Sequence, residues 1–186
     1  MPNVGDGKAK MLKKCREAQM AGVAAIVLLA FVAGCGKPAV VVEPPRPVTI
    51  AIDVKASASV NPDAEGRPSP IMVRVYQLAD DAALAKASLN DLWADEAKVL
   101  AASLVSRQEF MLEPGGSAQG SMTLEAATRQ VAVAAAFRDF RGATWRAALA
   151  TPQPPVPGAE LVLAVTLDAR SVSARLQPAT KPGAVN

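Results

Sequence analysis

Apolar residues at every second position are the feature that most constrains how this chain folds. From Val48 to Val60 all even-numbered positions are apolar, and polar residues such as Thr49 and Lys55 lie between them. A period of two residues is typical of a β-strand with one buried face. Comparable short segments follow, separated by turns rich in Gly, Pro and Asp. We predict strands over residues 48–60, 71–78, 107–113, 117–124, 130–140, 144–149, 161–167 and 171–176.

One segment between the second and third predicted strands has a different character. Asp80 and Asp81 precede an alanine-rich stretch, and carboxylates at a helix start accept its free amide hydrogens. We expect helical structure, with a break, from there to about residue 102. Seven or eight short strands with one helical insertion after the second predict a mainly β protein, a two-sheet β-sandwich.

The N-terminal segment has the pattern of an export signal. Five basic residues (Lys8, Lys10, Lys13, Lys14 and Arg16) precede an uncharged stretch over residues 18–35 that ends in Val32-Ala33-Gly34-Cys35. Small residues before a cleavage point are typical of secretory signals, and a cysteine after it resembles the bacterial lipobox, in which that cysteine is acylated. We predict that residues 1–34 are removed and that Cys35 is lipidated. A transmembrane anchor is the alternative, but the apolar core is shorter than the roughly 20 residues that a spanning helix needs.

Removing this signal changes the charge and thiol content of the chain. The whole chain has 20 Lys+Arg and 17 Asp+Glu, and residues 1–34 account for the entire excess of positive charge. The mature chain is formally neutral, so the pI gives no argument for a nucleic-acid partner. Cys15 is lost with the signal and Cys35 carries lipid, so we expect no disulfide in the mature chain.

The remaining chain divides into three parts. Residues 35–47 contain Pro44, Pro45 and Pro47 and predict an extended, lipidated tether. Residues 48–177 predict the β-sandwich domain, and residues 178–186 a flexible tail.

The segment between the first two predicted strands is a candidate binding loop. It contains Asn61, Pro62, Asp63, Glu65, Gly66, Arg67, Pro68 and Ser69 and ends at Pro70. Its prolines restrict φ, and its glycine permits a left-handed turn. Because a stiff loop loses little entropy on binding, we expect it to contact a partner. An ordinary hairpin connection remains the alternative.

The residue types present in the chain give little indication of catalysis. The chain has no histidine, so it lacks the usual base for a serine or cysteine nucleophile and the imidazole ligands of many metals. The carboxylate pairs Asp80-Asp81 and Asp95-Glu96 could serve a cell-wall glycosidase, but adjacent carboxylates in helical segments are more typical of caps. We expect a protein that is not an enzyme and needs no cofactor or metal.

The aromatic residues are more simply explained by packing than by function. We expect Trp93 and Trp145 in the core, and we expect Arg146 to stack or to pair with Asp139. Phe110, Phe137 and Phe140 are expected to pack within the sheets.

Five segments, in this order, resemble the TssJ family of type VI secretion lipoproteins. The most specific is NPDAEGRPSPIMVRVYQL at residues 61–78. It is followed by LNDLW at 89–93, EFMLEPG at 109–115, AAFRDF at 135–140 and Trp145-Arg146. Together with the lipobox, the resemblance covers roughly residues 35–177.

The resemblance implies a transthyretin-like sandwich with added helices and no enzymatic activity. It further implies that the protein anchors an envelope-spanning complex to the inner leaflet of the outer membrane, facing the periplasm, by binding the periplasmic C-terminal domain of TssM. The loop over residues 61–70 would engage TssM. Gly36, after the lipidated cysteine, resembles lipoproteins sorted to the outer membrane. No nucleic acid or small-molecule substrate is expected.

Two other functions remain open from the sequence. A periplasmic lipoprotein could carry a small apolar ligand or act as an assembly chaperone, and an enclosed apolar cavity would favour that function. A cell-wall hydrolase would need a cleft lined by two carboxylates.

Overall fold

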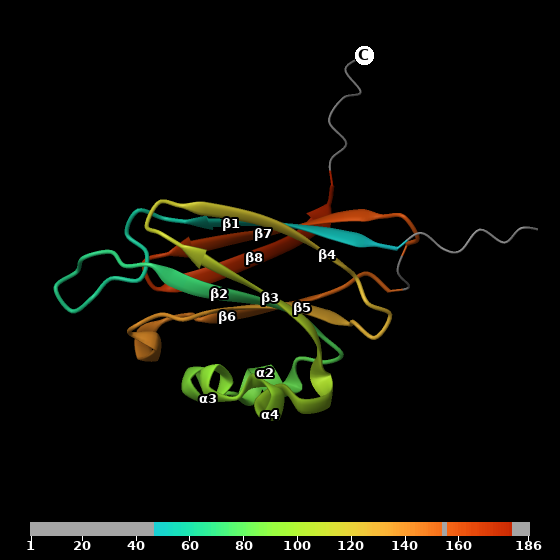
Figure 1. Cartoon of the computed structure of the whole chain (residues 1–186), viewed down its shortest axis with the longest axis horizontal. Coiled ribbons are helices and arrows are strands. Elements are labelled where there is room, and N and C mark those ends of the chain that lie inside the picture. Colours follow the sequence, from blue (N-terminus) through green and yellow to red (C-terminus); the bar gives the residue numbers. More distant parts are fainter. Residues whose placement is uncertain (1–46, 154–155, 180–186) are drawn as a thin grey trace, which may run out of the picture. The chain divides into compact units, whose positions relative to one another are not determined.

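Eight strands form two four-stranded sheets that face each other in the computed structural model, which describes residues 47–153 and 156–179 (Figure 1). The β1 sheet has the order β4-β1-β7-β8 and the β2 sheet the order β3-β2-β5-β6. Neighbouring strands are antiparallel except β1 and β7, which are parallel. The strands are β1 (Thr49–Ala56), β2 (Ile71–Leu78), β3 (Leu104–Leu112), β4 (Ser117–Thr123), β5 (Gln130–Ala135), β6 (Arg146–Ala150), β7 (Glu160–Asp168) and β8 (Ser171–Pro178). The two-sheet sandwich predicted from the sequence is confirmed. The signal peptide, Cys35, Gly36 and most of the tether lie outside the described residues.

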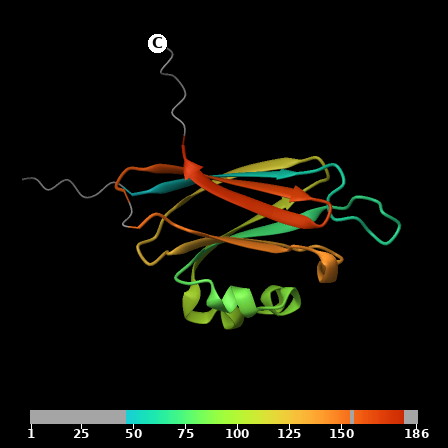
Figure 2. The same cartoon turned by 180° about the vertical axis from the view of Figure 1, so that it is seen from behind.

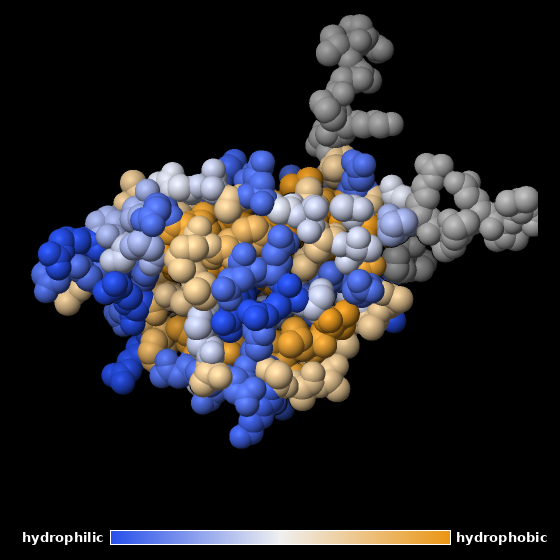
Figure 3. Space-filling model, viewed as in Figure 1, coloured by the Kyte–Doolittle hydropathy of each residue, from blue (hydrophilic) through white to orange (hydrophobic). Residues whose placement is uncertain are grey.

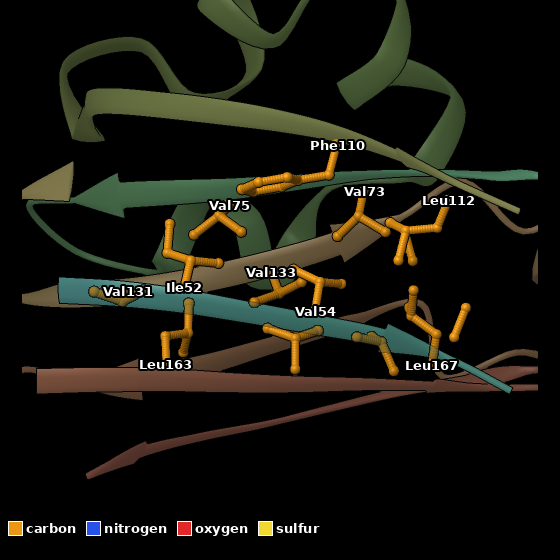
Figure 4. Close-up of a cluster of buried hydrophobic side chains, with 14 of the residues drawn as sticks. Ile52, Val54, Val73, Val75, Phe110, Leu112, Val131, Val133, Leu163 and Leu167 are labelled. Carbon is orange, nitrogen blue, oxygen red and sulfur yellow. The ribbon is translucent and has the colours of Figure 1, made fainter. Parts of the chain in front are cut away.

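The main core lies between the two sheets. Alternate residues of β1, Ile50, Ile52 and Val54, point inward and are at most 2% exposed. They meet the inward-facing residues of the other strands, among them Val73, Val75, Val131, Val133, Leu163 and Leu167 (Figure 4). Burial of each such side chain stabilises the fold by about 1.5–3 kcal/mol, which explains why the period-two pattern predicted these strands.

A second core lies on the outer face of the β2 sheet, under a layer of short helices (Figure 1 and, from behind, Figure 2). The helices are α2 (Ala82–Lys86), α3 (Leu89–Ala94), α4 (Glu96–Leu100) and the 3₁₀ turn η1 (Ala101–Ser103). Leu84, Leu92 and Leu100 pack there with Tyr76 and Leu78. The small side chains of Ala132 and Ala134 complete this cluster, so β5 is buried on both faces.

Glu96 attaches the helical layer to the β2 sheet by polar contacts. Its carboxylate lies 3.2 Å from Arg74 Nη1 and 2.7 Å from Arg107 Nε, and it accepts a hydrogen bond of 3.1 Å from the Tyr76 hydroxyl. Burial raises the pKa of that hydroxyl, so Tyr76 stays a neutral donor. The Arg74 guanidinium lies 4.7 Å from the centroid of the Trp93 ring, a distance that favours a cation–π contact.

Trp145 and Arg146 fix the helices on the other side. Arg146 stacks on the Trp145 ring at 4.5 Å, and its guanidinium donates to the carbonyls of Ala85 and Ala87 at the end of α2. Of the two alternatives for Arg146, stacking is therefore observed, whereas Asp139 pairs with Arg170. Both tryptophans are half-buried and pack against the second core rather than lying fully inside it.

Phe110 and Phe137 lie in the main core as expected. Phe140 is only half-buried and lines the surface of one end of the sandwich.

Element boundaries are where the sequence predictions were wrong. The first strand ends at Ala56 and not at residue 60, and the fifth ends at Ala135 and not at residue 140. In both cases apolar residues continue past the strand because the connecting loop folds back over the core, as Val60 and Phe137 do.

The helical stretch is broken twice. Ser88 caps α3 by accepting from the Asp91 amide, and Asp95 caps α4 by accepting from the Lys98 amide, both at 3.1 Å. Asp80 accepts from the Ala82 amide at 3.1 Å, whereas Asp81 makes no side-chain cap. Of the two carboxylate pairs, Asp80 and Asp95 accept amide hydrogens at helix starts as expected, whereas Asp81 does not and Glu96 pairs with arginines of the β2 sheet. Among the helices of the described ranges, none is long and apolar enough to cross a membrane.

Candidate partner-binding site

Four connections lie at one end of the sandwich, which we call the loop end. They are the β1–β2 loop, the β3–β4 turn, the β5–β6 connection and the β7–β8 turn, and the first of these projects farthest (Figure 1). The amide of Asn61 donates to the carbonyl of Ala169 at 3.0 Å, and the amide of Arg138 donates to Asn61 Oδ1 at 2.8 Å. We call the opposite end, where Pro47 leads into β1, the tether end.

Asn61 closes the loop at its base. Its side chain is buried, and its Nδ2 donates to the Pro70 carbonyl at 2.8 Å. The residue has a φ of 51°, a left-handed conformation that asparagine tolerates better than most residues. One side chain therefore joins the start of the loop, its end and the β5–β6 connection.

Asp63 organises the middle of the loop. Its Oδ1 accepts from the amides of Arg67 at 2.8 Å and Glu65 at 3.0 Å, and its Oδ2 accepts from Arg67 Nε at 2.8 Å. The hydrogen bond from the Arg67 amide is the main cause that holds the pKa of the Asp63 carboxyl below its ordinary value. Gly66 makes the turn with a φ of 81°.

The structure divides the eight predicted contact residues into three groups. Asn61 and Ser69 are buried and support the loop from inside. Pro62 and Asp63 are half-buried, and Glu65, Gly66, Arg67 and Pro68 form the exposed tip. Arg67 remains 73% exposed while bridging Asp63 and Glu65. The loop owes its order to this hydrogen-bond network as well as to its prolines.

An open groove of about 550 Å³ runs beside the loop. Pro62, Asp63 and Ala64 line one side of it, and the other side consists of Arg138, Asp139, Phe140, Arg141 and Arg170. Phe140 and Arg141 belong to the 3₁₀ turn η2 (Phe140–Gly142). The strongly hydrophilic surface over the protruding loop is visible at the left of Figure 3.

Sequence reasoning missed the second side of this groove. Arg138 lies 77 positions from Asn61 along the chain, and no local pattern reports such a contact. The only available signal was the density of charge in Arg138-Asp139-Phe140-Arg141 directly after an apolar strand.

A carrier of a small apolar ligand, one function left open by the sequence, would need an enclosed apolar cavity. An apolar recess at the tether end, lined by Val48, Leu124, Val156 and Leu161 among others, has a volume of about 210 Å³. That is smaller than the roughly 300–1,000 Å³ of typical ligand pockets. Within the described ranges, no group of three or more His, Cys, Asp or Glu side chains could hold a metal ion.

A protein-family model matches residues 48–170 of this chain. The matching family is described as type VI secretion lipoprotein, VasD, EvfM, TssJ, VC_A0113. A comparison with curated proteins found no significant match.

Solved structures give matches across nearly their whole length. The T6SS lipoprotein TssJ1 from Pseudomonas aeruginosa is 33% identical, with a TM-score of 0.65, and the match covers 72% of this chain and 99% of that one. Lip from Serratia marcescens, a membrane bound component of the Type VI Secretion System, is 28% identical over 74% of this chain and 99% of that one, with a TM-score of 0.62. A chain in the structure of the T6SS protein TssM C-terminal domain from EAEC is 26% identical over 68% of this chain and 97% of that one, with a TM-score of 0.55.

Proposed function

We infer the function from the premise that this chain belongs to the type VI secretion lipoprotein family that includes TssJ and VasD. We propose that it is a structural, non-catalytic component of the secretion membrane complex. In this role it is anchored to the inner leaflet of the outer membrane through lipid on Cys35, and it binds the periplasmic C-terminal domain of TssM through the loop over residues 61–70.

The observation that carries this proposal is the separation of the two ends of the sandwich. The chain enters β1 at the tether end, and the loop projects from the opposite end (Figure 1). The eight residues of β1 between them span roughly 26 Å at the usual rise of a strand. A lipid-anchored domain built in this way can present the loop to a partner away from its attachment point.

The construction of the loop also supports partner binding. Its base is fixed by Asn61 and its middle by Asp63, while Glu65, Arg67 and Pro68 are exposed at the tip. A preordered loop loses little conformational entropy on binding. The similarity to a chain in the structure of the TssM C-terminal domain favours TssM as that partner.

The proposed chain organisation follows from the same premise. Residues 1–34 are the signal peptide, residues 35–47 the lipidated tether, residues 48–177 the sandwich and residues 178–186 the tail. Gly36 directs the mature lipoprotein to the outer membrane. Three acyl chains would hold it there stably, since each buried CH₂ contributes about 0.8 kcal/mol.

The binding proposal is tested by changing only the tip of the loop. Replacing Ala64, Glu65, Arg67 and Pro68 with serine retains the buried Asn61 and Ser69. In the detergent-solubilised full chain we expect affinity for the TssM periplasmic domain to fall by roughly tenfold or more, with an unchanged midpoint of unfolding. The control replaces the exposed Ala126 and Ala127 at the tether end with serine. Unchanged affinity in the tip variant would rule out the loop as the binding element.

The anchor is tested separately by Cys35→Ser. We expect this variant to remain uncleaved or to fractionate away from the outer membrane. Normal processing together with normal outer-membrane fractionation would contradict lipidation at Cys35.

A further inference from the structure

We propose that the groove beside the loop binds a carboxylate-bearing segment of the TssM periplasmic domain through Arg138 and Arg141. This inference rests on the proposed function and extends it to the β5–β6 connection, which the loop hypothesis does not include. It also assigns a chemistry to the partner, which must present acidic side chains.

The ion pairs around the groove leave two guanidinium groups available. Asp139 pairs with Arg170 and Asp63 pairs with Arg67, each at 2.8 Å. Within residues 47–153 and 156–179, no ion pair joins Arg138 or Arg141 to a carboxylate. Both of these residues are exposed and line the groove. The aspartates of the groove each already hold another arginine in an ion pair. Arg138 acts on Asp63 only by charge attraction without an ion pair, which helps to lower the pKa of that carboxyl.

The backbone that carries the two arginines is held in place before any partner arrives. The Arg138 amide donates to Asn61 Oδ1 at 2.8 Å, so the β5–β6 connection is joined to the base of the loop. Farther along the same connection, the Thr144 amide donates to the Arg170 carbonyl at 3.0 Å. The first bond joins the two sides of the groove and the second supports the side that carries the arginines, so a partner segment meets a backbone that is already ordered and loses less free energy to ordering.

The lining of the groove suits a peptide carboxylate. Arginine presents a planar fork of donors that matches a carboxylate with two parallel hydrogen bonds. Phe140, half-buried between the two arginines in sequence, offers an apolar surface beside them. A phosphate surface such as a membrane would also attract arginines, but the connections that line the groove lie at the end of the sandwich opposite to the point where Pro47 leads into β1. This placement favours the protein partner.

The test uses the detergent-solubilised full chain and the TssM periplasmic domain. We expect the double variant R138E/R141E to bind roughly tenfold more weakly or worse at low salt, mainly through slower association. Its affinity should also depend less on salt concentration than that of the wild type. R138K/R141K, which retains both charges, should lose much less. Arg175→Glu on β8, an exposed arginine of the β1 sheet, should bind like the wild type.

The controls separate the possible outcomes. The unfolding midpoint of R138E/R141E should match the wild type, and Arg141→Glu alone provides a milder variant if it does not. Wild-type-like affinity in these variants would overturn the inference and leave the loop proposal standing. Failure of the wild type itself to bind the TssM domain would overturn both. Loss of adsorption to phosphatidylglycerol vesicles with unchanged TssM affinity would assign the arginines to a phosphate surface and also overturn the inference.

Discussion

Each end of the sandwich is closed by one buried side-chain amide, and the two amides support different kinds of surface. At the tether end Gln77 donates to the Thr123 carbonyl at 2.7 Å and accepts from the Glu125 amide at 2.9 Å and from the Thr128 hydroxyl at 2.7 Å. At the loop end Asn61 bonds to the Pro70 carbonyl and the Arg138 amide. Gln77 joins the two sheets through a short connection, whereas Asn61 supports a projecting, charged loop and the groove beside it.

The comparison shows that a buried side-chain amide can stabilise the fold at one end and hold a surface for a partner at the other. All three partners of Gln77 lie in one compact connection, over residues 123–128. The partners of Asn61 belong to two connections that together line the groove. Changes at the two amides should therefore separate stability from partner affinity.

We expect the largest effect from Gln77→Ala. It removes the three hydrogen bonds of the Gln77 side chain, and the three groups that they joined lose this partner. We expect the free energy of unfolding to fall by about 3 kcal/mol. Affinity of the folded protein for the TssM domain should not change. Chemical denaturation and binding measurements check this, with the exposed Gln119→Ala as the matched control. A large loss of affinity in Gln77→Ala would contradict the view that only the loop end contributes to binding.

Asn61→Ala should have a smaller effect on stability and a larger one on binding. Two hydrogen bonds are lost and an alanine must adopt a positive φ, so we expect a loss of about 2 kcal/mol. Because the loop and the β5–β6 connection separate, affinity for the TssM domain should fall by roughly tenfold. The exposed Asn90→Ala in α3 is the control. Full affinity in Asn61→Ala would show that the order of the loop is irrelevant to binding.

We expect the smallest effect from lowering the pH, which should weaken the order of the loop through Asp63. The pKa of Asp63 lies below its ordinary value in the folded loop, so ionised Asp63 stabilises the loop above its unfolded pKa of about 4. That contribution is lost as the pH falls through the folded pKa. Hydrogen exchange of the loop amides should therefore accelerate in acid, after correction for intrinsic rates. Asp63→Asn should show less of this acceleration than the wild type.

Asp81→Asn is the control for the acid experiment, because the Asp81 side chain makes no capping hydrogen bond. If hydrogen exchange of the loop amides depends on pH in the same way in the wild type and in Asp63→Asn, ionised Asp63 does not order the loop.

The strands were predictable because burial on one face leaves a regular pattern in the sequence. β1 and β7 alternate almost perfectly between buried and exposed residues. β5 does not, since it is buried on both faces by the core and the helices, and this is why its end was placed too late. Boundaries depend on where a loop folds back, which alternation does not encode.

The candidate site was predictable only on one side. The turn residues around Gly66 identified a stiff loop, but the Asn-Pro dipeptide gave no indication that Asn61 is buried at 3% exposure. The groove depends on a contact between Asn61 and Arg138, which lie 77 positions apart. Such contacts follow from the strand order of the two sheets, and one sequence alone does not specify that order.

The central claim is that the partner binds at the loop end of a domain that is attached at its other end. Hydrogen–deuterium exchange of the full chain, with and without the TssM periplasmic domain, tests it most directly. We expect protection over residues 61–70 and 136–143 and unchanged exchange over residues 123–129 and 156–161. Protection confined to the tether end, with the loop unaffected, would contradict the claim.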